Sequence, residues 1–316
     1  MKQSIGAILL AVVLLLSSCG DGGKRSAVPE APEEETILFT DDLGQELCIP
    51  RPRRVAALIG SFADIWCLAG GRDTLTAAAN DAWTSFDLGL GKDVADLGAI
   101  KEPNLELLLA RQPDLILASS NTAADLELRD TFRQAGIPAA YFDIQTVQDY
   151  LNMLDICTRL TGCPENYQRY GLDVLAQVEA AQARADGSRP TVLCIRATGS
   201  SCKAKGSRDN VLGEMLAGLD CVNIADREGA LLDDLSLEAI LLADPDYIFA
   251  VLQGADPARA EEMLERTLLS NPAWRRLRAV EEGRFYTLEH RLYNLKPNAR
   301  WGEAYEQLAD ILYGPE

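Results

Sequence analysis

A seventeen-residue segment occurs twice in this chain, and its recurrence limits the folds that the chain can adopt. The first copy is 103–119 (PNLELLLARQPDLILAS) and the second is 235–251 (LSLEAILLADPDYIFAV). Aligned without a gap, the copies share the residues that stand in the first copy as Leu105, Glu106, Leu109, Pro113, Asp114, Ile116 and Ala118. Each copy predicts a short helix, capped by Asn104 or Ser236, followed by a buried strand. A repeat of this length predicts two lobes built on one plan.

Strand patterns and helix patterns alternate around both copies of the repeat. In the first half, short apolar runs predict strands at 54–59, 75–79, 115–118 and 139–142, after a hairpin at 37–49. In the second half, similar runs predict strands at 191–195, 247–251 and 284–288. This alternation predicts the α/β class, with a mostly parallel sheet in each half.

The middle of the chain lacks strand patterns and is predicted to be helical. Pro164 suits the first turn of a helix. Apolar residues then recur at helical spacing, at Leu172, Leu175, Val178 and Ala181. We therefore expect an N-terminal lobe at 37–163, a single long connecting helix at 164–187 and a C-terminal lobe at 188–316.

The first nineteen residues have the pattern of an export signal. Lys2 gives a charged start, and the apolar run 5–16 is too short to span a bilayer. Small residues then precede Cys19 and resemble a bacterial lipobox, which would make Cys19 the lipidated first residue of the mature protein. The alternative is an ordinary signal peptide with a chance cysteine. Residues 20–36 are rich in Gly, Pro, Glu and Lys, and we expect a flexible tether there.

Charge and cysteine content limit the partners and the covalent links. The formal net charge is −18, which argues against a nucleic-acid partner and favours solubility. Seven cysteines remain besides Cys19, so an exported protein cannot pair all of them internally. None of them forms a CxxC pair with the spacing of a metal site. Cys157 and Cys163 are close enough in sequence to pair.

Five segments, in their order along the chain, resemble one protein family. They are DDLGQELCIPRPRRVAAL, EPNLELLLARQPDLILAS, GLDCVNIAD, LSLEAILLADPDYIFAV and NPAWRRLRAVEEGRFYTLE. After a lipobox, this order resembles the substrate-binding lipoproteins of ABC importers for iron–siderophore, cobalamin and haem. The resemblance covers nearly the whole mature chain. It implies two Rossmann-like lobes, a rigid connecting helix and a ligand cleft between the lobes.

The same resemblance implies partners and a location. The partners would be an ABC permease dimer with cytoplasmic ATPase subunits, and the ligand would be a small metal chelate. The protein would be exported and held by its N-terminal lipid at the outer face of the cell membrane, or on the periplasmic side in a Gram-negative cell. No cofactor and no catalytic residue is implied, because ATP hydrolysis in the partner subunits would drive transport.

The repeated glutamates, Glu106 and Glu238, each fall two residues after a predicted helix cap. A carboxylate in a first turn stabilises the helix dipole by about 0.3–1 kcal/mol, and that role would explain a single copy. Two copies, one on each lobe, favour a further role. In the family that the chain resembles, the matching glutamates pair with arginines of the permease, so the resemblance implies a docking role for both.

In open α/β sheets the ligand sits beyond the carboxyl ends of the strands. In the first lobe this rule indicates Ser61, Phe62, Trp83 and Phe86. In the second lobe it indicates Arg196, Lys203, Arg227, His290, Arg291 and Tyr293. The second set is basic in a very acidic chain, which indicates an anionic ligand. The planar donors of arginine suit carboxylate or catecholate oxygens, although any one of these cations could be a solvated loop residue.

The chain has only one histidine, His290. A bare zinc, manganese or ferrous ion would require several histidine and carboxylate ligands, so we expect no direct metal ligand. A haem iron needs one axial His or Tyr, which leaves His290 or Tyr293 for haem. A ferric siderophore already fills the coordination sphere of its iron, and cobalamin would prefer aromatic side chains to arginines. We rank a ferric siderophore first, then cobalamin, then haem.

An exported α/β lipoprotein enzyme is the alternative class. The sequence contains no GxSxG elbow, no P-loop and no HExxH motif. A Ser–His pair could use only His290, and no nucleophile motif points to it. We therefore expect a binding protein rather than an enzyme.

Overall fold

A computed structural model describes residues 35–208, 210–227, 231, 235–254 and 256–315. Residues 35–316 cluster into one compact unit. The predicted signal, Cys19 and nearly all of the predicted tether lie outside the described residues. No helix within the described ranges is both long enough and apolar enough to cross a membrane.

The described part begins with the predicted hairpin. Strand β1 (Thr36–Thr40) pairs antiparallel with β2 (Glu46–Pro50). The carboxylate of Asp41 closes the turn, because it accepts hydrogen bonds from the backbone N–H groups of Leu43 and Gln45 at 3.0 and 2.8 Å. β1 starts one residue inside the segment that the sequence assigns to the tether.

The N-terminal lobe contains a five-stranded sheet whose strands are all parallel, in the order β5-β4-β3-β6-β7. The strands are β3 (Val55–Ala57), β4 (Leu75–Ala78), β5 (Ala95–Asp96), β6 (Leu115–Ser119) and β7 (Ala139–Phe142). The helices of this lobe are α1 (Gly60–Leu68), α2 (Asp81–Thr84), α3 (Leu105–Ala110), α4 (Ala123–Glu127) and α5 (Arg129–Gln134). The chain adds strands first on one side of β3 and then on the other, so the topological switch point lies between β3 and β6.

The C-terminal lobe contains a second sheet, in the order β10-β8-β11-β12. Its parallel strands are β8 (Thr191–Ala197), β10 (Val222–Asn223), β11 (Tyr247–Leu252) and β12 (Phe285–Leu288). Its helices are α9 (Val211–Gly218), α11 (Leu237–Ala243), α12 (Pro257–Leu264), α13 (Arg278–Glu281), α14 (His290–Tyr293) and α15 (Trp301–Tyr313). The switch point of this sheet lies between β8 and β11.

One prediction about the second lobe is wrong. The sequence predicts that the strand ends at 195, but β8 continues to Ala197 and a further strand, β9 (Cys202–Lys205), pairs with it antiparallel. Only a short turn separates the two strands, and Ser201 O accepts the backbone N–H of Thr198 at 2.8 Å across it. Arg196 therefore lies within a strand and not after one.

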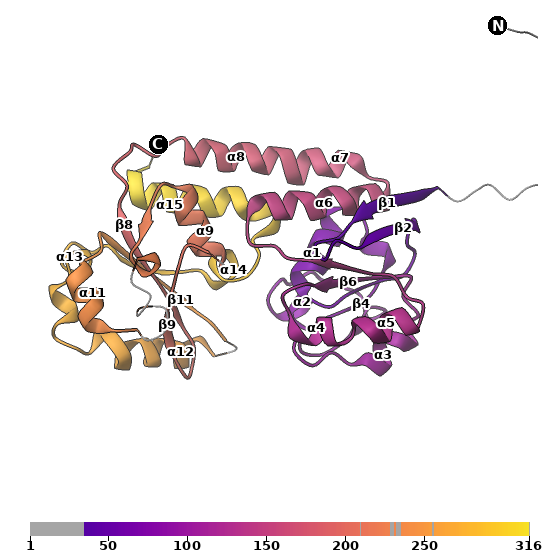
Figure 1. The fold of residues 1–316 in the computed structure, drawn as a ribbon, viewed down its shortest axis with the longest axis horizontal. Helices are drawn as coiled ribbons and strands as arrows, with labels where there is room; N and C mark the ends of the chain where they lie inside the picture. The colour runs from indigo at the N-terminus through magenta and orange to yellow at the C-terminus, as the bar shows by residue number, and fades with distance from the viewer. Residues whose placement is uncertain (1–34, 209, 228–230, 232–234, 255, 316) are drawn as a thin grey trace, which may run out of the picture. The chain divides into compact units, whose positions relative to one another are not determined.

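Helices connect the two lobes (Figure 1). Helix α6 (Val147–Thr161) starts at a capping box and ends at Gly162, and α7 (Pro164–Tyr167) follows. A π-helical turn leads without a break into α8 (Asp173–Gln182), so the predicted connecting helix is continuous over 164–182 and ends before the predicted bound of 187. Cys157 and Cys163 are both free thiols, so the suggested pairing between them is wrong.

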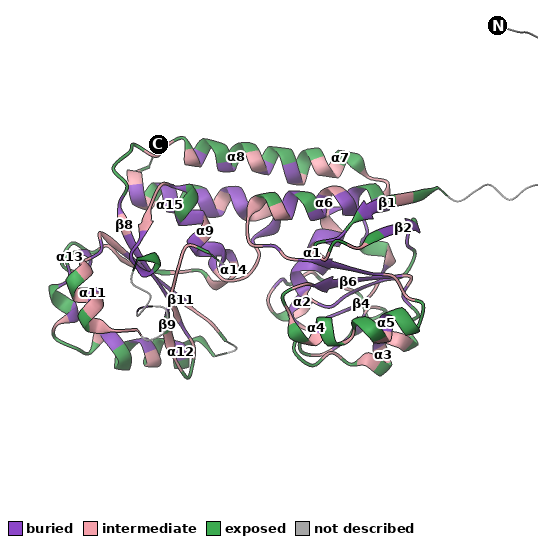
Figure 2. Ribbon diagram, viewed as in Figure 1, coloured by how far each residue is buried: buried purple, intermediate pink, exposed green. Residues whose placement is uncertain are grey.

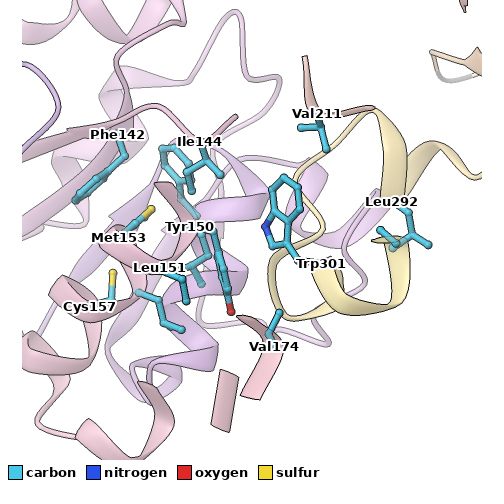
Figure 3. Close-up of a cluster of buried hydrophobic side chains, with 14 of the residues drawn as sticks. Phe142, Ile144, Tyr150, Leu151, Met153, Cys157, Val174, Val211, Leu292 and Trp301 are labelled. Atoms are coloured by element: carbon cyan, nitrogen blue, oxygen red, sulfur yellow. The ribbon is translucent and has the colours of Figure 1, made fainter. Parts of the chain in front are cut away.

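The largest hydrophobic core extends through both lobes. It joins Phe142 and Tyr150 of the first half to Val174 of α8, and these to Val211 and Trp301 of the second half. Figure 3 shows these side chains gathered in one cluster. Figure 2 shows that α6 and α15 are buried along most of their length, whereas α8 is exposed on one side. Because α15 packs along α8, the two lobes share one core and are held by it.

The two copies of the repeat have the same local structure. Asn104 Oδ1 accepts the N–H of Leu107 at 2.9 Å, and Ser236 Oγ accepts that of Ala239 at 3.3 Å, as the predicted caps require. Both helices then end at a residue with positive φ, 48° at Gln112 and 39° at Asp244.

The aspartate of each copy binds the neighbouring strand. Asp114 accepts the N–H groups of Arg53 and Arg54, which lead into β3, at 2.9–3.1 Å. Asp246 accepts the N–H and the hydroxyl of Thr191, which begins β8, at 2.8 and 2.7 Å. The aspartate of the repeat therefore connects each helix–strand unit to the central strand beside it.

Replacing Asp246 tests this tie. We expect Asp246→Ala to lower the free energy of unfolding by about 1–3 kcal/mol, because it leaves the donors of Thr191 without their acceptor. Chemical denaturation followed by circular dichroism measures the change. The control is Glu127→Ala, an exposed carboxylate on α4. An unfolding free energy equal for both variants would contradict the assignment.

Candidate ligand-binding site

In the N-terminal lobe, buried carboxylates hold the carboxyl ends of the two strands at the switch point. Asp81 Oδ1 accepts the N–H of Gly60, just after β3, at 2.8 Å. Asp125 Oδ2 accepts the N–H of Ser119, at the end of β6, at 2.7 Å. Burial raises the pKa of Asp81 to about 6 and that of Asp125 to about 7. Both carboxyl groups therefore titrate at or below neutral pH, far above the usual range of aspartate.

The residue at position 60 must be glycine. A Cβ there would lie 2.5 Å from the backbone nitrogen of Ala82. The absence of a side chain lets α1 and α2 approach closely, so the start of α1 lies against Asp81 at the carboxyl end of β3.

The predicted first-lobe residues are mostly part of the core. Ser61 is 2% exposed and Phe62 is 1% exposed. The ring of Phe62 packs edge-on against Phe142 with the centroids 6.2 Å apart. These two side chains therefore face protein in this structure, and Trp83, which is half-buried, is more accessible.

Phe86 links the first lobe to the segment after β12. Its ring is buried, and the guanidinium carbon of Arg291 lies 5.4 Å from the ring centroid. This is a cation–π geometry. The structure therefore brings together the predicted residues Phe86 and Arg291.

A group of cations forms around the carboxyl end of β8. Burial lowers the pKa of Arg196, and burial together with the nearby charge of Arg196 lowers the pKa of His290. Burial also lowers the pKa of Lys296, where Arg196 acts in the same direction and Asp143 and Asp149 of the first lobe oppose it. Arg196 and Lys296 thus share one partly desolvated environment with His290, whose lowered pKa leaves its ring uncharged at neutral pH. We call the two cations Arg196 and Lys296 the cation group.

Lys203 extends this group along the edge of the sheet. It is the cross-strand partner of Arg196 in the β8–β9 ladder, and paired residues project from the same face of a sheet. Its side chain is exposed. Arg227, by contrast, is exposed at the end of a short 3₁₀ turn, and no described contact joins it to the cation group.

Both predicted haem ligands make hydrogen bonds within the protein. Asn294 Nδ2 lies 3.0 Å from His290 Nε2, so this ring nitrogen is engaged within the protein. Tyr293 is 3% exposed, and its hydroxyl lies 3.1 Å from both Ala304 O and Gln307 Oε1. Burial raises its pKa far above the ordinary value, so the phenolate that would bind iron is disfavoured.

Polar contacts at the site include residues that the sequence analysis missed. Asn298 is fully buried in a left-handed conformation, with φ 55°. Its Nδ2 donates to Ser61 O and to Asp64 Oδ2, both at 2.9 Å, and so joins the segment before α15 to α1. Burial raises the pKa of Asp64, although Asn298 and the nearby Arg291 oppose the rise.

Asp143 was also missed, although a signal for it exists. It directly follows β7, and its carboxylate accepts from Asn121 at 2.6 Å and Gln145 at 2.7 Å. Applying the rule of carboxyl strand ends to β7 would have found it. For Asn298 the same rule indicates only the whole segment 289–301 after the last strand. It does not single out Asn298, because the partners of this side chain lie more than two hundred residues away.

The repeated glutamates occupy the expected positions. Glu106 lies in the first turn of α3 and Glu238 in the first turn of α11, and both are exposed. Their docking role stays a prediction. Across the described ranges, no group of three or more His, Cys, Asp or Glu residues has a geometry that could hold a metal ion.

Two mainly parallel sheets with their switch points, connected by helices and by one core, define a two-lobed protein of the α/β class. Residues 55–292 match the model of the family described as periplasmic binding protein. The match covers most of the chain, and the chain belongs to this family.

The individual relatives share about a quarter or less of their residues with this chain. The chain is 24% identical over 294 residues to the Fe(3+)-citrate-binding protein YfmC of Bacillus subtilis, covering 90% of this chain and 88% of the relative. It is 26% identical over 292 residues to the ferric-anguibactin-binding protein FatB of Vibrio anguillarum, covering 85% and 86%. Among solved structures, the siderophore-binding protein BauB, bound to acinetobactin and ferric iron, aligns with a TM-score of 0.69 at 19% identity, covering 89% of this chain and 98% of BauB.

Asp125 predicts a pH dependence of stability. Because its pKa is raised in the folded state, folding binds a proton, and this contribution is complete below about pH 4 and lost as the pH rises through about 7. We expect Asp125→Asn to remove this dependence. The unfolding free energy of the wild type minus that of the variant should fall by up to about 4 kcal/mol from pH 4 to pH 7.5.

Denaturation curves of both proteins at several pH values measure this difference. Asp130→Asn, an exposed aspartate on α5, is the control and should leave the profile of the wild type unchanged. A difference between wild type and Asp125→Asn that stays constant with pH would contradict the raised pKa.

Proposed function

We propose that this chain is the extracytoplasmic binding lipoprotein of an ABC importer and that it captures a ferric chelate of the siderophore type. The observation that carries the proposal is the cation group, which is partly buried at the carboxyl end of β8 in a chain of net charge −18. Burial deprives these cations of part of the hydration that stabilises their charge. An anionic ligand would stabilise the charged forms again through charge-assisted hydrogen bonds.

The ligand class follows from the donors in the site. Arg196, Lys203 and Arg291 offer hydrogen-bond donors suited to carboxylate or catecholate oxygens. Trp83, which is half-buried, adds aromatic surface for an organic ligand, and Phe86 supports Arg291 from below its guanidinium. The two curated relatives are named for ferric citrate and ferric anguibactin, and this supports an iron complex whose coordination sphere is already filled.

Haem and cobalamin are the alternatives within the same importer class. A haem site gains little support, because His290 Nε2 contacts Asn294 and Tyr293 is buried. Cobalamin would make less use of the cation group, since it carries little charge. An exported enzyme is a weaker alternative, because the residues at the site suit binding and the family is one of binding proteins.

The anchor and the partners complete the proposal. Cys19 would carry the lipid that holds the protein at the outer face of the membrane, and residues 20–36 would be the tether. The partners would be a permease dimer and its ATPase subunits. Glu106 and Glu238, one on each lobe, would pair with cations of the permease and would set the orientation and spacing of docking.

Ligand capture is tested with the intrinsic fluorescence of the purified protein. We expect ferric citrate or a ferric catecholate to change the emission with saturable binding, and cyanocobalamin and haemin to bind more weakly. Arg196→Gln should weaken binding of the ferric chelate by about ten-fold or more, because it removes a charge-assisted hydrogen bond.

The matched control is Arg227→Gln, which makes the same change at an exposed arginine away from the cation group. Equal affinities of the wild type and Arg196→Gln for every chelate that binds would overturn the assigned site. If cyanocobalamin or haemin bound more tightly than every ferric chelate, that compound would take the place of the ferric chelate as the proposed ligand.

Docking is tested by reversing both charges. We expect the double variant Glu106→Arg, Glu238→Arg to bind the ferric chelate normally and to fail in uptake by cells, because like charges would then face each other at the permease. A control with Glu127→Arg and Glu261→Arg makes the same change of charge on exposed glutamates of both lobes. Normal uptake by the first variant would refute the docking role.

A further inference from the structure

Leu242 is far more exposed than any other large apolar side chain in the described ranges. Its exposed fraction is 88%, whereas Leu38 has 60%, Leu172 41% and Leu126 39%. Single exposed leucines are common at protein surfaces, so exposure alone assigns no role. Its place in the repeat supplies the further argument.

Leu242 lies one helical turn after Glu238 on α11. Residues four apart on a helix are neighbours on one face, so the carboxylate and the leucine form a single surface. Ile240, on the opposite side of the helix, is fully buried, so the side that carries Glu238 and Leu242 faces outward. The cap by Ser236 holds the first turn of the helix in place. The result is a rigid apolar knob beside an anionic group.

The matching surface of the first lobe has the glutamate but not the exposed leucine. In the alignment of the repeat, Glu106 matches Glu238, and Ala110 matches Leu242. Ala110 is exposed on α3, just as Leu242 is on α11. The two faces therefore share the glutamate but differ in apolar area.

We propose that Leu242 is an apolar anchor that inserts into a recess of the permease, beside the cation that pairs with Glu238. This inference rests on the docking role proposed above. Charge pairs at an interface mainly speed and orient the encounter, whereas burial of an apolar side chain slows dissociation. The C-terminal lobe thereby contributes more to the lifetime of the complex, and the two lobes are not equivalent in docking.

A second copy of this chain is a poorer occupant for the same face. A two-fold contact through Leu242 would bring the two copies of Glu238 together, and each chain carries a net charge of −18. A basic partner surface with an apolar recess complements both the leucine and the carboxylate.

The test measures binding of the purified protein to the cognate permease–ATPase complex in lipid nanodiscs. We expect Leu242→Ala to weaken binding by about ten- to thirty-fold, mainly through faster dissociation, with the same ratio at low and high salt. Leu38→Ala, at the next most exposed leucine, is the matched control and should bind as the wild type does. Glu238→Gln should instead lose its effect as the salt concentration rises.

Several results would overturn the inference. Wild-type affinity of Leu242→Ala, while the double charge reversal abolishes binding, would remove the anchor and keep the docking role. Unchanged binding by the double charge reversal would remove the docking role itself and the anchor with it. A wild-type dimer in sedimentation analysis that Leu242→Ala dissociates would assign the face to a second copy.

Discussion

The packing of α15 against α8 is the constraint on which the rest of this structure depends. Each lobe has a sheet of its own, but the largest core runs from Phe142 and Tyr150 through Val174 to Trp301. Since side chains from both halves fill it, moving one lobe away from the other would expose apolar area at about 25 cal/mol per Å². This cost favours small adjustments around a fixed frame over wide opening.

The site uses this frame to hold charges that water would otherwise stabilise. Arg196, His290 and Lys296 are partly desolvated together, and desolvation opposes the charged form of each. The nearby negative charges of Asp143 and Asp149 in the first lobe favour the charged form of Lys296 and offset part of that cost. An anionic ligand would compete with these carboxylates for the same cations, which would couple ligand binding to contacts between the lobes.

The repeat serves the fold and the surface with different residues. Its aspartates, Asp114 and Asp246, bind the neighbouring strands and hold each lobe together. Its glutamates, Glu106 and Glu238, are exposed in the first turns of α3 and α11, so they are available for a partner. One seventeen-residue pattern thus fixes a local structure and presents a charge at a set place on both lobes.

The sequence by itself determined the elements, because caps, apolar periods and the Pro-Asp ends of the repeat are local signals. It predicted both repeat helices, the parallel strands and the basic character of the second lobe. Tertiary structure decided which predicted side chains are accessible: Phe62 and Tyr293 follow the rule of strand ends yet pack into the core. It also decided the contact of Asn298 with Ser61 and Asp64, and the pairing of β9 with β8. These outcomes depend on what folds against each residue from elsewhere in the chain, and no local pattern carries that information.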